Sequence, residues 1–350
     1  MTFSTDVFPS LVDWSNMADP DGTIADIAWI LSQCNDIVKD IIWHQANAPL
    51  YHKITVNSAL PIATWRGNNQ GVPSSKPLNA QVSFTMGMMA AYSKVDKAEA
   101  DLYGEIGKFR WNQDQPHIQG MSQQAASAFF YSNEAVNPNQ FTGLSIYYSS
   151  LVTATAQTAK NVLSAGGSGN NNSSIWLCSH GDESLFGIFP KGSQAGLVYQ
   201  DKGDLRGLYD ANGNEFEGYT SYFEWKLGLA VKDWRYTVRV CNIDTTTSGL
   251  FGTAPPDLNG LLVQAANKLP TSTRRMSNIT SSDAPGDPVP GTNPCFYSNR
   301  TVKTGMELQA IRDKNVLISL KEYAGQPVEM WRDVPWRVCD ALLTTESTVS

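Results

Sequence analysis

The sequence contains few residues that bind metals or form disulfides. Among its 350 residues are five cysteines and four histidines. The cysteines are far apart, with no Cys-x-x-Cys pair, and no histidine has a partner at the spacing of a zinc site. We therefore expect reduced cysteines in the core, no metal ion and no cofactor.

Strong charge and long apolar runs are also missing. The formal net charge is −7 at pH 7, with both signs scattered along the chain, which is unlike the basic surface of a nucleic-acid reader. No stretch approaches the roughly 18 to 20 apolar residues of a membrane span, and the N-terminus lacks the pattern of a signal peptide. We expect a soluble protein with no membrane partner and no sequence-specific DNA binding.

The segment GIFPKGSQAGLVYQDKGDL, residues 187–205, has the glycines and the lysine of a phosphate-binding loop but not their order. Such a loop places glycine, lysine and a hydroxyl residue in that order before a helix. Here Lys191 precedes Gly192 and Ser193, and a strand-like run follows. We interpret the segment as the turns of a β-hairpin.

Other catalytic motifs are incomplete. The cluster SHGDES, residues 179–184, holds serine, histidine and aspartate side by side, whereas members of a catalytic triad are seldom adjacent in sequence. The DANGNE motif from Asp210 lacks the glycine and the glutamate of a calcium loop, and its Asn-Gly pair is a hairpin signal. No catalytic residue is predicted. Three carboxylates remain available to a cleft: Glu224, Asp233 and Asp244.

Apolar residues are plentiful, at 41% of the chain with 10% aromatic residues, which is enough for a substantial core. An extended N-terminal arm is expected to lead into the first of several helices, and Pro116 suits the first turn of the third. Apolar residues recur at helical spacing in five segments: 23–45, 95–109, 115–132, 256–270 and 302–314.

A long two-stranded ribbon is predicted between residues 51 and 96, with a wide tip rich in Gly, Asn, Pro and Ser from Gly67 to Asn79. On its return strand Val82, Phe84 and Met86 alternate with polar residues, so that one face is apolar. A two-stranded ribbon is marginally stable alone. It therefore needs either its own body or a neighbouring chain to lie against.

The remaining chain is rich in strands. Alternation between residues 219 and 244, with a turn at Lys232 and Asp233, predicts a half-buried antiparallel hairpin. A polar loop is expected over 271–293. Further short strands are predicted at 173–181, 185–192, 196–203, 295–299, 316–323, 326–333 and 335–343.

Ten tryptophans are spread through every segment, including the arm and the ribbon. Trp176 and Trp225 are interpreted as ordinary core residues. Trp14 and Trp65 lie in segments that cannot bury them internally, which favours burial against another subunit. The alternative is a β-rich carbohydrate-binding module or glycoside hydrolase, in which exposed tryptophans would cluster in one cleft.

A family resemblance covers the chain from about residue 20 to the C-terminus. In order, it is carried by LPIATWRGNNQGVPSSK, KVDKAEADL, QGMSQQAASAFFYSN, FTGL, SSIWLCSHG, GIFPKGSQAGLVYQDKG, WKLGLAVKDWRYTVRVCNID, FYSNRTV and GQPVEMWRDVPWRVCDALLTTE. Together these motifs resemble the major capsid proteins of tailed bacteriophages.

The resemblance implies an α+β protein with the Hong Kong 97-like capsid fold. Its expected parts are an N-terminal arm and helix (1–50), an extended β-loop (51–92), a peripheral domain with a spine helix at 115–132 (93–250), an axial domain (251–325), and closing strands with a C-terminal tail (326–350). The predicted hairpin at 219–244 precedes the FYSN unit, which departs from the usual order and indicates a rearranged chain.

The function implied is that of a structural subunit without catalytic activity, which assembles with itself into hexamers and pentamers of an icosahedral head. Implied partners are a portal protein, scaffolding and cement or decoration proteins, and packaged double-stranded DNA on the inner face. The expected location is the virion, after assembly in the host cytoplasm. The candidate contacts between subunits are Trp14, Trp65, Arg66, Phe84 and Met86.

Overall fold

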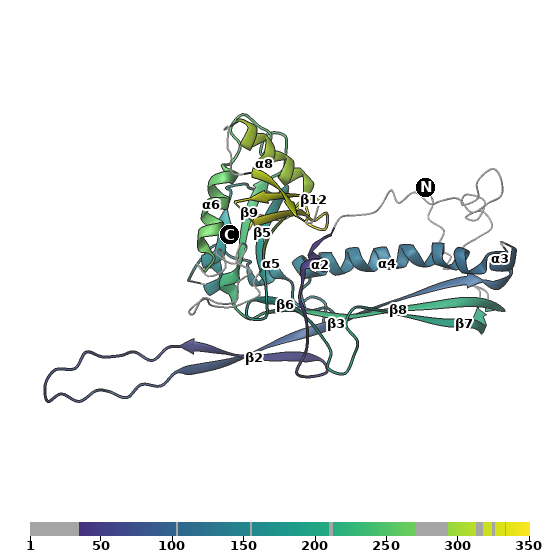
Figure 1. Cartoon of the computed structure of the whole chain (residues 1–350), viewed down its shortest axis with the longest axis horizontal. Helices are drawn as coiled ribbons and strands as arrows, with labels where there is room; N and C mark the ends of the chain where they lie inside the picture. The colour runs from purple at the N-terminus through teal and green to yellow at the C-terminus, as the bar shows by residue number, and fades with distance from the viewer. Residues whose placement is uncertain are drawn as a thin grey trace.

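The protein is elongated, with a ribbon at one end, a long helix lying on strands at the other, and a mixed body of helices and strands beside the middle (Figure 1). These features come from a computed structural model. It describes residues 35–102, 104–154, 156–209, 213–270, 293–312, 318–323, 326–332 and 334–350.

The described elements are runs of strands separated by helices and short 3-10 turns. The helices and 3-10 turns are α2 (Ile37–Asp40), α3 (Lys97–Leu102), α4 (Ile106–Tyr131), α5 (Leu144–Tyr147), η1 (Gln157–Asn161), η2 (Trp234–Tyr236), α6 (Leu258–Lys268) and α8 (Arg300–Arg312). The strands are β1 (Trp43–Gln45), β2 (Tyr51–Ala59), β3 (Leu78–Asp96), β4 (Val162–Ser164), β5 (Asn172–His180), β6 (Leu185–Phe189), β7 (Leu197–Tyr209), β8 (Glu215–Val231), β9 (Thr237–Asp244), β10 (Asn293–Ser298), β11 (Ile318–Tyr323), β12 (Gln326–Trp331) and β13 (Val334–Val338).

The predicted ribbon is confirmed. Strands β2 and β3 pair antiparallel from Tyr51 opposite Thr85 outward to Ala59 opposite Leu78. Without interruption β3 then continues into the body, where Met86 to Asp96 pair with β8. One strand of 19 residues therefore belongs first to the ribbon and then to the central sheet.

Helix α4 lies along β3 and β8, and it is longer than its sequence pattern predicts (Figure 1). It begins at Ile106, so Pro116 stands inside the helix and not in its first turn. An interior proline costs a helical hydrogen bond, but the preceding turns are held by Phe109, which is buried against Val95 and Ala100. This packing keeps the chain helical through the proline.

The predicted hairpin at 219–244 is wrong. Strands β8 and β9 both form, but β8 pairs with β3, β6 and β7, whereas β9 pairs with β4 and β5. Between them the chain turns a corner at η2, where the Asn161 amide donates to the carbonyl oxygens of Trp234, Arg235 and Thr237 at 3.3, 3.1 and 3.0 Å. Both strands still precede β10 in the chain, so the rearranged chain order stays a prediction.

The glycine-rich segment 187–205 contains the turn between two strands, as interpreted, but these strands do not form a hairpin. Strands β6 and β7 do not pair with each other in the described structure, because each pairs with a different part of β8. The hairpin predicted from the Asn-Gly pair is confirmed, since Tyr209 of β7 lies opposite Glu215 of β8.

A second body is built from β4, β5, β9, β10 and β13 with helices α6 and α8 (Figure 1). The helix predicted within residues 256–270 is confirmed, and the Asp257 carboxylate caps it by accepting from the Gly260 amide at 2.8 Å. One apolar cluster joins Val238 and Val240 to Leu258 and Leu262. Packing therefore continues across the expected domain limit at residue 250.

The helix predicted over residues 23–45 is largely replaced by other structure within the described part. Only Ile37–Asp40 is helical, and Trp43–Gln45 forms β1, which pairs in parallel with β6. Strand geometry is favoured here because Ile41 and Trp43 pack directly over Gly187, where a β-carbon would come within 2.6 Å of Ile41. The rest of that predicted helix and the loop predicted over 271–293 lie outside the described residues, apart from Asn293 at the start of β10.

The last ten residues, 341–350, run back over the molecule and form what we call the C-terminal strap. Its centre is Glu346, which accepts hydrogen bonds from Tyr131 of α4 and Ser174 of β5 and pairs with Arg239 of β9 at 2.9 Å. The Glu346 and Arg239 side chains are each only 5% exposed. The strap thus joins α4 to the second body.

Candidate subunit-contact surfaces

The outer part of the ribbon exposes large apolar side chains. Leu60, Ile62 and Trp65 are 77%, 81% and 102% exposed, and Val72 and Leu78 are also exposed. Each exposed apolar side chain is unremarkable alone, but a group of them on a projecting element indicates an interaction surface.

The predicted contact residues have different surroundings. Trp65 and Arg66 are exposed on the outer part of the ribbon. Phe84 is only 4% exposed, because the ribbon's base lies on the body of its own chain, so its side chain is covered before any neighbour binds. Met86 packs against the same cluster. Trp14 lies outside the described residues.

The base of the ribbon is fixed to the body by apolar and polar contacts. Phe84 packs with Phe186 and Ile188 of β6, and its ring centroid lies 6.3 Å from that of Tyr147. The Thr85 hydroxyl donates to the Glu134 carboxylate at 2.8 Å. Phe84 and Thr85 therefore anchor the ribbon's base to the body of the chain.

A groove of about 820 Å³ opens beside this base, and we call it the ribbon-base groove. One wall is the apolar face of the ribbon, and the other is the corner at residues 231–236. Sequence reasoning missed this feature, because the two walls are distant in the chain. Its apolar lining consists of Ile54, Val56, Leu60, Val82, Phe84, Tyr147, Val231, Trp234 and Tyr236.

The charged groups at the groove are paired with one another. Lys232 forms an ion pair with Glu183, and Arg235 forms one with Asp233 at 2.6 Å. The Asp233 hydrogen bonds raise the pKa of the Arg235 guanidinium. Charge therefore balances around an apolar centre.

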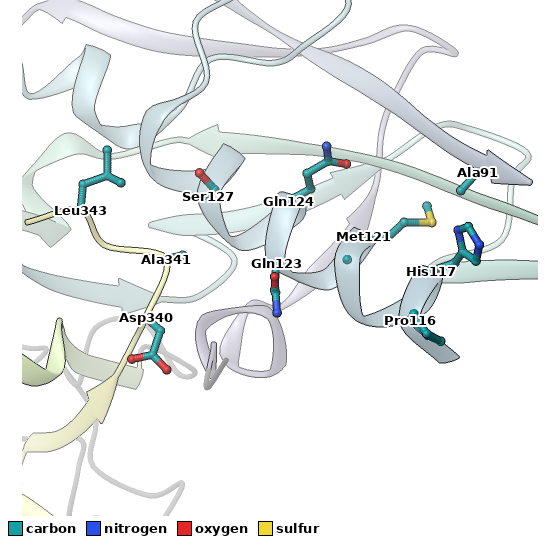
Figure 2. A pocket seen from close by; sticks show the side chains of 11 residues that line it. Ala91, Pro116, His117, Met121, Gln123, Gln124, Ser127, Asp340, Ala341 and Leu343 are labelled. Atoms are coloured by element: carbon teal, nitrogen blue, oxygen red, sulfur yellow. The ribbon is translucent and has the colours of Figure 1, made fainter. Parts of the chain in front are cut away.

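A second depression, of about 530 Å³, follows the outer side of α4 (Figure 2). Figure 2 shows His117, Gln123, Gln124 and Ser127 of the helix on one side and Asp340 and Leu343 on the other. Its lining combines the amides of Gln123 and Gln124 with the apolar side chains of Met121 and Leu343, and the described residues contain no group of three or more side chains that could hold a metal ion.

The residues that the sequence offered for catalysis do not come together in a common site in the described structure. His180 is buried and bonded to the Tyr297 hydroxyl at 2.9 Å, whereas Asp182 pairs with His44 at 2.9 Å. Burial lowers the pKa of His180 to about 4, so the imidazole is neutral at pH 7. Glu224 and Asp233 are each in an ion pair on different elements.

The tryptophans do not form a carbohydrate platform in the described structure. Trp176 and Trp225 are buried, as predicted for core residues. The two most exposed tryptophans among the described residues, Trp65 and Trp111, lie on the ribbon and on α4, which point to opposite ends of the molecule (Figure 1). The four described cysteines are buried, and no described helix has the length and hydrophobicity of a membrane span.

Comparison with known proteins assigns this architecture. The model of the family described as major capsid protein GP7 matches residues 19–350. The chain belongs to this family. In a solved structure of bacteriophage epsilon15, a chain 30% identical matches with a TM-score of 0.75 over 100% of this chain and 99% of that one.

Members of the GP7 family are major capsid proteins, so this chain is a shell-forming subunit of a phage virion that associates with copies of itself. Its fold is the Hong Kong 97-like capsid fold. A bacteriophage JBD30 capsid chain matches at 9% identity and a TM-score of 0.44, over 89% of this chain and 92% of that one. The SrpI encapsulin of Synechococcus elongatus matches at 11% identity and a TM-score of 0.44, over 67% of this chain and 95% of that one. No curated protein matches the chain significantly.

Proposed function

We propose that this capsid protein assembles into hexamers and pentamers that close into an icosahedral head around double-stranded DNA, without catalytic activity. The observation that carries the proposal is the ribbon, whose outer part exposes Leu60, Ile62 and Trp65 while its base is fixed to the body. Closed shells need heterologous contacts in which one surface of a subunit meets a different surface of the next. A projecting apolar element provides one such surface.

In this proposal the ribbon is the extended loop, which was expected over residues 51–92 but pairs as a ribbon only as far as Thr85, and α4 is the spine helix of the peripheral domain. The second body, made of β4, β5, β9, β10, β13, α6 and α8, is the axial domain. Its strands come from both sides of residue 250, so its limits differ from the sequence expectation of 251–325.

The further partners proposed are a portal protein, scaffolding and cement proteins, and DNA on the inner face without sequence-specific contacts. Support for the last is electrostatic, since a net charge of −7 disfavours tight adhesion of DNA to the wall. Assembly is proposed to take place in the host cytoplasm, before the subunit becomes part of the virion.

The test is assembly of the purified chain and of a Trp65→Ala variant, followed by sedimentation velocity and electron microscopy. Because Trp65 is fully exposed in the free chain, the substitution leaves subunit stability within about 0.5 kcal/mol. An anchoring tryptophan at an interface contributes about 2 kcal/mol, or roughly 30-fold in the association constant of each contact. Trp65→Phe is the matched control and retains assembly.

We expect the wild-type chain to form shells or rings and the Trp65→Ala variant to form neither. A wild-type chain that stays monomeric at high concentration would overturn the shell proposal. Normal shells from Trp65→Ala would instead show that the outer ribbon is not a contact.

A further inference from the structure

The ribbon-base groove has a large apolar surface that nothing in the described chain covers. Val82 stands in its wall at 37% exposed, beside the buried Phe84. Leu60 lines the end of the groove and also belongs to the exposed outer ribbon. The groove is therefore continuous with the apolar surface already proposed to contact a neighbour.

The chemistry of the groove excludes a charged ligand. Its ion pairs, Glu183 with Lys232 and Asp233 with Arg235, leave no net charge to attract phosphate or a cation. None of its lining side chains contains a buried polar atom that lacks a hydrogen-bond partner. Its apolar wall therefore favours an apolar occupant, because a polar group placed against that wall would lose hydrogen bonds to water without replacement.

We propose that the groove receives apolar side chains of a second copy of this chain, an inference that rests on the proposed shell-forming function. A volume of about 820 Å³ is enough for several side chains. A heterologous contact joins two different and complementary surfaces of the same kind of subunit, so a projecting apolar surface needs an apolar receiving surface elsewhere on the subunit. The ribbon-base groove is a concave surface of that kind, and family members are built to meet copies of themselves.

Two adjacent residues of β3 provide a matched test. Val82 faces the groove, whereas Gln81 is exposed on the opposite face of the ribbon. We expect Val82→Asp to raise the protein concentration needed for shell formation at least 10-fold, because assembly would bury its carboxylate. Gln81→Asp should change that concentration less than twofold. Circular dichroism of the free subunits checks that both variants fold.

Cysteine labelling measures occupancy directly. In Val82→Cys and Gln81→Cys variants, a water-soluble maleimide is reacted with free subunits and with assembled shells. The expected result is a labelling rate at position 82 that falls at least 10-fold on assembly, with a much smaller change at position 81. Protection at position 82 that is already present in the free subunit would mean another occupant and would overturn the inference.

The two proposals fail in different ways. If the wild-type chain forms no shells, the shell function fails and the groove inference falls with it. If shells form but position 82 is labelled as fast in them as in subunits, the groove inference alone is wrong.

Discussion

Removing the carboxylate at the centre of the C-terminal strap should destabilise the subunit strongly. In Glu346→Ala, Arg239 keeps its position at 5% exposed but loses its ion pair, and Tyr131 and Ser174 lose their acceptors. Two further bonds stay with the guanidinium, to the Ser174 hydroxyl at 3.1 Å and the Tyr148 carbonyl at 2.9 Å. These bonds do not neutralise its charge.

The loss of stability depends on whether a buried charge is left without its partner. Breaking a buried ion pair by removing one member typically costs about 3–5 kcal/mol, whereas replacing both members with apolar residues is often neutral. We therefore expect Glu346→Ala to lose about 3–5 kcal/mol of the free energy of unfolding. The double variant Arg239→Met with Glu346→Leu should lose clearly less than the single one.

Urea unfolding of the unassembled subunit, followed by tryptophan fluorescence and circular dichroism, measures both variants. Trp176 is a suitable reporter, because the Arg239 guanidinium lies 5.0 Å from its ring centroid. A loss below about 1 kcal/mol for Glu346→Ala would refute the reasoning, since it would match a solvent-exposed ion pair. A double variant less stable than the single one would also refute it.

Two further predictions concern protonation and packing. Burial lowers the pKa of His180 from 6.5 to about 4, so the unfolded chain takes up a proton that the folded chain rejects, and stability should fall by up to about 3 kcal/mol as the pH drops from 6.5 to 4. Urea midpoints at several pH values should show a smaller decline in His180→Gln. In Gly143→Ala, the new β-carbon would meet the Ala128 carbonyl oxygen at 2.7 Å and the Phe130 carbonyl carbon at 2.9 Å, so thermal unfolding should report a loss of about 1–3 kcal/mol. The control Gly120→Ala, in open space within α4, should leave stability equal or raised by up to about 1 kcal/mol.

Local pattern was sufficient for elements whose apolar residues repeat with one period. The ribbon and the α6 helix were predicted from such patterns, and the Asn-Gly pair predicted the β7–β8 hairpin. The α4 helix was predicted too short, because Pro116 is a local start signal and the packing of Phe109 that overrides it is tertiary.

Pairing between elements was beyond the sequence. Alternation in β8 and β9 identifies two strands, but nothing local shows that a corner held by Asn161 separates them into different parts of the sheet. Likewise, alternation through Phe84 indicates an apolar face without telling whether the chain's own β6 or a neighbour covers it. The ribbon-base groove depends on both of these long-range arrangements.

Strand β3 runs without interruption from the ribbon into the body, so it connects the two mechanically. Nineteen residues of extended chain span about 60 Å, and its two halves share one backbone with no break between Thr85 and Met86. A sideways displacement of the outer ribbon would therefore twist the paired strands β3 and β8, against which α4 packs. If the outer ribbon contacts a neighbouring subunit as proposed, a force applied there would reach the opposite end of the subunit through a single strand.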